Sequence, residues 1–340
     1  MFSRSIARPL LVLVQVPLFA IPAAATWVMD YTGQLSPNFH EQHCVRPAAV
    51  SYAPDADELC VTDVGLRSLR VYSGAGLFSF ATGELAGLAQ PADAVLDGEG
   101  GFIVIDRDAA RGATLRRLDL RGEPSAFSAE APCANWLPEH LLLTQGGDLV
   151  SVDDMNRLLC KHDGATGALL WSRTVEAGPE DADRDLGLGR PAEAPDGRLY
   201  LPSGILHRVL VFSADGEARE GFGRFGSARG QLVFPAGVAF GPEGLVLVLD
   251  RLRHLVLLYD GQHRFLAEFG SFGSGPGQFY HPSAIAAAPD GRVFVAQGYQ
   301  GRVQSFRLQA AREVSLAAWA GCFRPIDLIL QCVRSLNPSA

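Results

Sequence analysis

The feature that most constrains the fold is an internal repeat of about 45 residues. It is clearest late in the chain, where Gly223-Arg-Phe-Gly-Ser-Ala-Arg-Gly-Gln-Leu-Val-Phe-Pro235 is echoed by Gly270-Ser-Phe-Gly-Ser-Gly-Pro-Gly-Gln-Phe-Tyr-His-Pro282. Each segment is followed by three short apolar runs separated by turn residues, which predict strands. A repeat of this length indicates a supersecondary unit that must stack on its neighbours to bury its apolar faces.

The two late copies predict strands at corresponding places. The expected strands are Gly237–Phe240, Leu245–Leu249 and Leu255–Tyr259 in the fifth copy, and Ala284–Ala287, Val293–Ala296 and Val303–Phe306 in the sixth. A proline opens five copies, at Pro47, Pro91, Pro138, Pro235 and Pro282. The remaining copy is anchored by Ala194-Pro-Asp-Gly-Arg-Leu-Tyr-Leu201, which matches Ala288-Pro-Asp-Gly-Arg-Val-Phe-Val295 and puts Leu188 in place of the proline.

These segments resemble the NHL repeat, whose pattern runs Gly-x-Gly-x-Phe-x-x-Pro, strand, Asp/Asn-Gly turn, a strand ending in Asp, and Arg-Val before a third strand. The resemblance covers about residues 43–308 and implies an all-β, six-bladed β-propeller. The third copy departs from it, because Asp163-Gly-Ala-Thr-Gly-Ala-Leu-Leu-Trp171 fits the tryptophan-docking pattern of quinoprotein propellers. We interpret that single copy as a packing device between blades.

Ring closure needs one more strand, because the sixth copy is one strand short after Phe306. Without closure an apolar face of the first or last blade would stay in water. We expect Trp27-Val-Met-Asp-Tyr-Thr-Gly33 to add the outermost strand of the sixth blade. The alternative is that residues after 309 supply it.

Both ends of the chain differ from the repeats. Residues 1–25 have a basic start, an apolar run and Ala23-Ala24-Ala25, which is typical of a removable signal peptide. This pattern predicts a periplasmic or secreted protein that is not integral to the membrane after cleavage. A retained anchor is the alternative, although the run is short and broken by Gln15 and Pro17. We expect the propeller over residues 26–310 and a partly helical C-terminal tail over residues 311–340.

Charge and cysteine content limit the partners and the redox state. Cleavage would remove Arg4 and Arg8 and no acid, so the formal charge moves from −8 to −10, which argues against a nucleic-acid partner. An even number of cysteines in an exported protein is compatible with disulfides. We predict a Cys322–Cys332 disulfide. The pairing of the others stays open; they are Cys44, Cys60, Cys133 and Cys160.

The repeat register also predicts a site. The resemblance implies that ligand or catalytic groups gather at the mouth of the central channel, next to the repeat prolines. The candidates in that register are Arg46, Gln90, Asp93, His140, Arg190, Phe234 and His281. Such a set could bind an anionic small molecule or hold a metal ion, with His140 and His281 as metal ligands and zinc or calcium as the ion. The alternative is that Asp93 and Arg190 pair with each other and line a water-filled channel.

Other polar residues have structural interpretations. Because Asp63, Asp106, Asp153 and Asp250 recur once per copy, we expect them to accept backbone N–H bonds in the turn after the second strand. We expect a structural role also for the residues before the third strand, Arg70, Arg157, Arg208 and Arg302. His40-Glu-Gln-His43-Cys44 lacks the HExxH spacing and indicates surface histidines, and Glu180–Asp185 indicates a solvated loop.

Three functions follow. The first is a non-catalytic module that binds a protein, peptide or glycan partner. The second is a metal-dependent lyase or lactonase-like enzyme with its site at the channel mouth, as in related six-bladed families. The third is a periplasmic subunit of an envelope or electron-transfer assembly. The fold alone does not decide among them.

Overall fold

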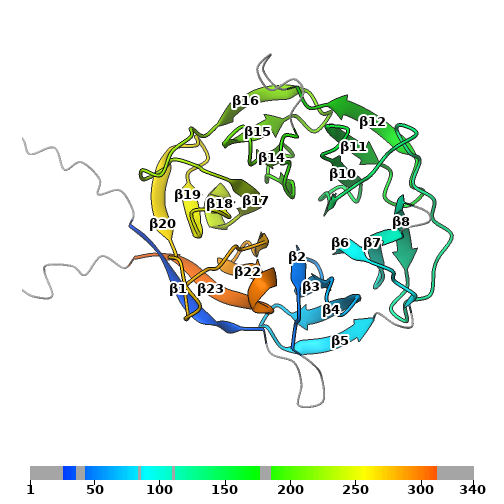
Figure 1. The fold of residues 1–340 in the computed structure, drawn as a ribbon, viewed down its shortest axis with the longest axis horizontal. Coiled ribbons are helices and arrows are strands. Elements are labelled where there is room, and N and C mark those ends of the chain that lie inside the picture. Colours follow the sequence, from blue (N-terminus) through cyan, green and yellow to red (C-terminus); the bar gives the residue numbers. More distant parts are fainter. Residues whose placement is uncertain (1–25, 36–42, 83–85, 109–111, 177–184, 312–340) are drawn as a thin grey trace, which may run out of the picture.

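The computed structural model describes residues 26–35, 43–82, 86–108, 112–176 and 185–311. Six antiparallel sheets stand around a common axis as the blades of a β-propeller (Figure 1). This confirms the all-β, six-bladed architecture. The predicted signal peptide, the C-terminal tail, the Cys322–Cys332 pair and most of the 40–44 and 180–185 segments lie outside the described residues.

The first three blades follow one another along the chain. Blade one contains β2 (Pro47–Ala53), β3 (Glu58–Asp63), β4 (Ser68–Ser73) and β5 (Phe78–Thr82). Blade two contains β6 (Pro91–Leu96), β7 (Phe102–Asp108) and β8 (Gly112–Leu118). Blade three contains β9 (His140–Leu143), β10 (Leu149–Asp153), β11 (Leu158–His162) and β12 (Leu169–Thr174).

The last three blades include the clearest repeats. Blade four contains β13 (Ala192–Glu193), β14 (Leu199–Ser203), β15 (Arg208–Phe212) and β16 (Ala218–Phe222). Blade five contains β17 (Pro235–Phe240), β18 (Val246–Asp250), β19 (Leu255–Tyr259) and β20 (Phe265–Phe269), with the 3₁₀ turn η3 (Pro242–Gly244). Blade six contains β21 (Ala284–Ala287), β22 (Arg292–Gln297), η4 (Gly298–Gln300), β23 (Arg302–Ala310) and β1 (Trp27–Gln34).

The N-terminal strand closes the ring. β1 pairs antiparallel with β23 from Trp27 opposite Ala310 to Gln34 opposite Gln304. The sixth sheet therefore has the order β1-β23-β22-β21, with β1 outermost. This confirms that the segment before the first repeat supplies the missing strand of the last blade.

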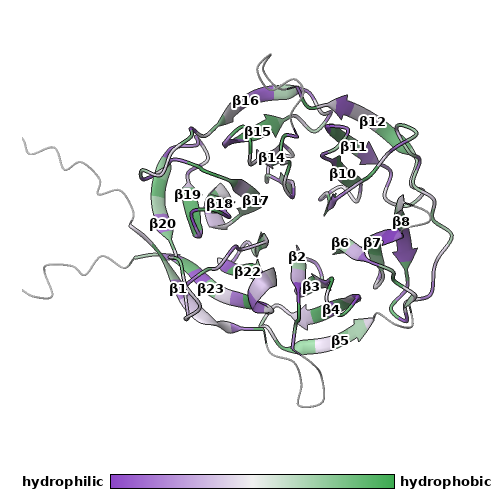
Figure 2. Ribbon diagram, viewed as in Figure 1, coloured by the Kyte–Doolittle hydropathy of each residue, from purple (hydrophilic) through white to green (hydrophobic). Residues whose placement is uncertain are grey.

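The core is divided among the interfaces between blades. In the described chain, six clusters of buried apolar side chains each join two neighbouring blades, including one between blades six and one. Outermost strands such as β12 and β16 carry more hydrophilic residues, because one of their edges faces water (Figure 2). Each blade therefore depends on both neighbours for its burial.

The recurring acids tie each second strand to the loop that enters its blade. Asp250 accepts backbone N–H bonds from Val233 and Phe234 before β17, and from Leu252 and Arg253 in the turn after β18. Asp63 and Asp153 accept N–H bonds from both places, whereas Asp106 accepts them from the entering loop alone among the described residues. The structural interpretation of these acids is confirmed. It extends to Arg208, which donates to the Gly221 carbonyl of β16, and to Arg302, which donates to carbonyls of the loop before β21.

Blade two has three strands in place of four. The segment after β8 makes only an isolated bridge between Leu118 and Pro124 before the chain enters blade three. Pro124, Pro132 and Pro138 lie in this stretch, and proline cannot donate to a strand ladder. Among the described residues, blade two therefore lacks the fourth, outermost strand that the other five blades have.

Two further expectations concern blade three and the thiols. Trp171 on β12 packs against the apolar cluster between blades three and four, and Thr166 donates to Asp163 in the turn before it, so the predicted packing role is confirmed.

The cysteines that the structure describes are all free thiols, namely Cys44, Cys60, Cys133 and Cys160.

Candidate functional site: the central cavity and its mouth

A cavity of about 590 Å³ lies at one end of the propeller axis, and all six repeats line it in the same register. The residue directly after each repeat proline, or after Leu188 in blade four, contributes to its wall: Ala48, Ala92, Glu139, Gly189, Ala236 and Ser283. The loops that enter the blades and the turns after the second strands supply most of the other lining groups. The volume is in the range of small-molecule sites.

The structure brings together most of the site residues predicted from the register. Six of them line the cavity: Arg46, Gln90, His140, Arg190, Phe234 and His281. Asp93 does not line it, because its side chain is fully buried behind the wall, where it contacts Arg190. The predicted residues therefore lie in one place, with Asp93 as support beneath it.

Sequence reasoning missed several polar groups of the same cavity. Arg107, Asp154 and Arg251 each follow the acid that ends a second strand, and Glu139 follows Pro138. A search of these two repeat positions would have found them, since the register places them at the same end of each blade. Tyr299 lies in the corresponding turn of blade six, two residues after Gln297, which ends the second strand there.

Blades two to four build a wall of paired charges, here called the ionic wall and defined as Asp93, Arg107, Glu139, His140 and Arg190. Arg190 Nε donates to Asp93 Oδ2 at 2.9 Å, which confirms the predicted pair. The same carboxylate accepts the backbone N–H groups of Leu141 and Ala94 at 2.9 and 2.8 Å. Arg107 Nη2 donates to Glu139 Oε1 at 2.9 Å. Burial raises the pKa of the Asp93 carboxyl, against the opposing effect of Arg190.

His140 lies between these charges. Its Nδ1 is 4.0 Å from Asp93 Oδ2, and its side chain is 29% exposed. Burial in the cavity wall, together with the guanidinium groups of Arg190, Arg251 and Arg107, lowers the pKa of His140 to about 3. The imidazole is therefore neutral at pH 7 and adds no charge to the cavity.

Blades five and six build a different wall, here called the aromatic wall and defined as Phe234, Arg251, His281 and Tyr299. The Arg251 guanidinium lies over the Phe234 ring, 5.7 Å from its centroid. A Cβ atom at Gly204 would lie 2.5 Å from that ring, so the missing side chain there makes room for Phe234. Burial lowers the pKa of Arg251, and no carboxylate in the described chain pairs with it.

The aromatic wall continues outward into a ring cluster. His254 lies 5.0 Å from both Phe272 and His281, measured between ring centroids. Tyr280 lies 4.8 Å from His281 and 6.2 Å from Tyr299. The backbone N–H of His281 donates to His254 Nδ1, and both histidines have positive φ, so an unusual loop conformation orients their rings toward one another.

The loops around the cavity opening carry most of the exposed large hydrophobic side chains of the described residues. Eight of the twelve exposed large hydrophobic side chains of the described residues lie in these loops; we call this set the mouth face, and its members are Val45, Met155, Ile205, Phe225, Leu252, Phe272, Tyr280 and Tyr299. The remaining four are dispersed: Tyr31, Leu77, Leu120 and Leu170. Clustered exposed apolar groups at an opening are typical of binding surfaces, whereas single ones are common everywhere.

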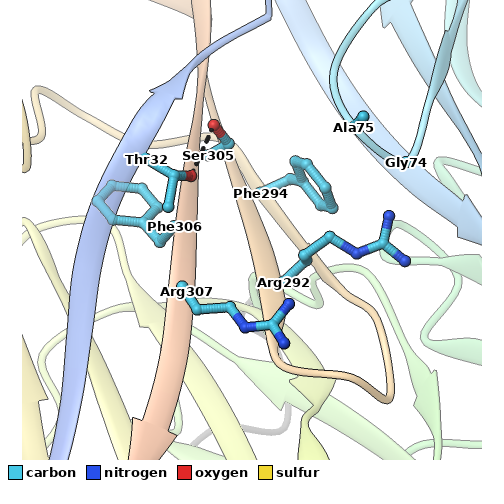
Figure 3. Close-up of a pocket in the computed structure, with 8 residues that line it drawn as sticks. All are labelled: Thr32, Gly74, Ala75, Arg292, Phe294, Ser305, Phe306 and Arg307. Atoms are coloured by element: carbon cyan, nitrogen blue, oxygen red, sulfur yellow. Dashed lines mark hydrogen bonds between the residues drawn. The ribbon is translucent and has the colours of Figure 1, made fainter.

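A second hollow of about 310 Å³ lies on the outside of the ring, where β1 and β23 approach the turn at Gly74 and Ala75 (Figure 3). Thr32 Oγ1 donates to Ser305 Oγ across its floor at 3.1 Å. Arg292 donates to Asp57 and Asp290, and Arg307 is 3.6 Å from Asp290. Because its cations already have carboxylate partners, this hollow serves as a joint between blades six and one.

The described residues of the cavity do not form a metal site. Within the described ranges, no group of three His, Cys, Asp or Glu side chains lies close enough to hold a metal ion, so no third ligand joins His140 and His281 there. His140 is also held among three arginines, whose charge disfavours a bound cation. The side chains around the cavity therefore do not fit a bound zinc or calcium ion.

No family model and no curated protein matches this chain, so its membership of the NHL-repeat family stays a prediction. Solved structures do match. An auxiliary nutrient binding protein from Bacteroides thetaiotaomicron aligns with a TM-score of 0.61 and 11% identity over 84% of this chain and 77% of that one. A streptogramin B lyase aligns at 0.56 and 12% identity over 84% and 88%, and Kuenenia stuttgartiensis hydrazine synthase at 0.54 and 14% over 79% and 98%. At these identities the likeness establishes the fold, a β-propeller, alone.

No helix within the described ranges has the length and apolar character needed to cross a membrane.

Proposed function

We propose that this chain is an exported, non-catalytic recognition module that binds a protein or peptide partner with its mouth face. The observation that carries the proposal is the gathering of exposed apolar side chains around the opening of the central cavity. Export follows from the signal-like residues 1–25. A propeller of NHL type would present this face as a rigid platform, because its blades brace one another.

The composition of the mouth face favours a polypeptide over a glycan. Four of its members are aliphatic or thioether side chains: Val45, Met155, Ile205 and Leu252. Such groups pack favourably against apolar side chains, whereas a sugar presents hydroxyl groups that need polar partners. The aromatic members, Phe225, Phe272, Tyr280 and Tyr299, are of the kind enriched in protein interfaces.

A selection experiment tests this proposal. The mature protein would be screened against a displayed random-peptide library, beside a Phe272→Ser/Tyr299→Ser variant and a matched Leu77→Ser/Leu120→Ser variant. All four positions are exposed, so neither variant should disturb the core. We expect peptides that bind the unaltered protein and the matched variant and lose about tenfold or more on the mouth-face variant.

Two outcomes would contradict the proposal. One is the absence of any selected peptide, and the other is selected peptides that bind both variants equally. Binding to a glycan array that is lost in the same mouth-face variant would replace the peptide with a glycan.

A further inference from the structure

The charges of the cavity are unlike those of the whole chain. Four guanidinium groups line the cavity, from Arg46, Arg107, Arg190 and Arg251. They face the carboxylates of Glu139 and Asp154, with Asp93 behind the wall. The immediate surroundings are therefore positive, four cations against three anions, in a protein whose formal net charge is −8. A positive cavity in a negatively charged protein concentrates anionic ligands.

Several donors of this set are unused. Arg190 bonds Asp93 through Nε alone, and its two terminal nitrogens have no hydrogen-bond partner among the described residues. Arg251 has a ring beneath it and no carboxylate, and the Arg46 side chain has no ion pair within the same ranges. Asp154 forms no ion pair with them among the described residues; its carboxylate accepts the backbone N–H of Leu188 at 2.9 Å. Guanidinium groups with free forks bind planar oxyanions through two parallel hydrogen bonds.

The surroundings of these donors define the rest of the ligand. Phe234, His281 and Tyr299 line the cavity beside Arg251, so a group next to the anion would meet aromatic rings. His140 is neutral at pH 7 and adds no charge of its own to the cavity. We infer that the cavity takes a carboxylate joined to an apolar or aromatic body, held by Arg251, Arg46 and the terminal nitrogens of Arg190. This inference rests on the proposed function and specifies the chemical group that enters the cavity beneath the mouth face.

Such a carboxylate could come from the C-terminus of a peptide or from a free organic acid, and one set of probes separates the sources. N-acetyl-phenylalanine represents the free acid, and a selected mouth-face peptide would be made with a free carboxylate and with a C-terminal amide. N-acetyl-phenylalanine amide is the neutral counterpart of the small acid. Calorimetry and ligand-observed NMR at pH 7 would measure affinity with the full mature chain.

We expect each acid that uses the site to bind at least about tenfold more tightly than its amide, because charge-assisted hydrogen bonds are lost with the charge. Arg251→Gln should remove that difference, and Arg251→Lys should restore part of it. The matched Arg219→Gln variant, in an exposed pair on the outer strand of blade four, should leave it unchanged. Thermal melting of each variant would establish that it is folded.

The possible results are distinct. A difference seen only with N-acetyl-phenylalanine assigns the site to free acids, and one seen only with the peptide assigns it to a chain end. Equal binding of acid and amide, a difference that survives Arg251→Gln, or no binding of any acid at about 10 mM would overturn the inference. If peptide binding remains dependent on Phe272 and Tyr299 in that case, the proposed function stands without the carboxylate.

Discussion

The two walls of the cavity satisfy their charges in opposite ways. On the ionic wall, Arg190 pairs with a fully buried carboxylate and Arg107 pairs with Glu139. On the aromatic wall, Arg251 lies over a ring and has no carboxylate in the described chain. A charge that is already paired holds blades together, whereas an unpaired, partly buried charge has a cost that a ligand can relieve. We therefore expect the ionic wall to organise the cavity and the aromatic wall to contact the ligand.

The largest expected effect comes from breaking the pair that joins blades two and four. Arg190→Gln would leave the Asp93 carboxylate buried without its cation, and we expect the free energy of unfolding to fall by about 3 kcal/mol. Urea denaturation at pH 7 would measure it. Arg219→Gln, in an exposed pair with Glu217, should cost less than about 1 kcal/mol.

Removing both charges provides the control for this prediction. The Asp93→Asn/Arg190→Gln double variant should be more stable than Arg190→Gln alone, because no uncompensated charge stays buried. If the single variant loses less than about 1 kcal/mol, the ionic wall does not depend on this pair.

A second, smaller effect concerns pH. The pKa of His140 falls from 6.5 to about 3 on folding, so between these values the unfolded chain binds a proton that the folded chain does not. Stability from this group is present above pH 6.5 and is lost as the pH falls toward 3. We expect a loss of about 2 kcal/mol between pH 7 and pH 5.

The measurement is a comparison of urea denaturation at both pH values for the unaltered protein and His140→Gln. The difference between the two proteins isolates this histidine from other groups that titrate in the same range. A variant that keeps the whole pH dependence would mean that His140 is not held neutral by the cations around it.

The sequence predicted the ring better than it predicted the site. Repeat spacing identified six blades and the closing strand, because a period in sequence becomes a rotation in space. The same register brought Arg190 and His140 to one cavity and anticipated the Asp93–Arg190 pair. The missed Arg251 immediately follows the structural acid Asp250, at a position whose residue type varies from copy to copy and therefore gives no recurring signal.

Other properties could not follow from repeat positions. The surroundings of Phe272 depend on how loops of two blades fold against each other, since its ring contacts His254 of blade five, and no single repeat specifies this. The three-stranded blade two arises from a proline-containing segment between copies, where the repeat pattern makes no prediction.

The smallest expected effect makes the sharpest contrast, because it uses the same substitution on the other wall. Arg251→Gln removes a partly buried cation that has no carboxylate to leave behind. The substitution removes the desolvation cost of the cation but also loses its stacking on Phe234, which is worth about 0.5–1 kcal/mol. Because these two effects oppose each other, we expect the free energy of unfolding to stay the same or rise by about 0.5 kcal/mol. Urea denaturation beside Arg190→Gln would measure both. Arg190→Gln should lower the stability and Arg251→Gln should not. An equal loss at the two positions would show that Arg251 also holds the fold together. The distinction between an organising wall and a recognition wall would then fail.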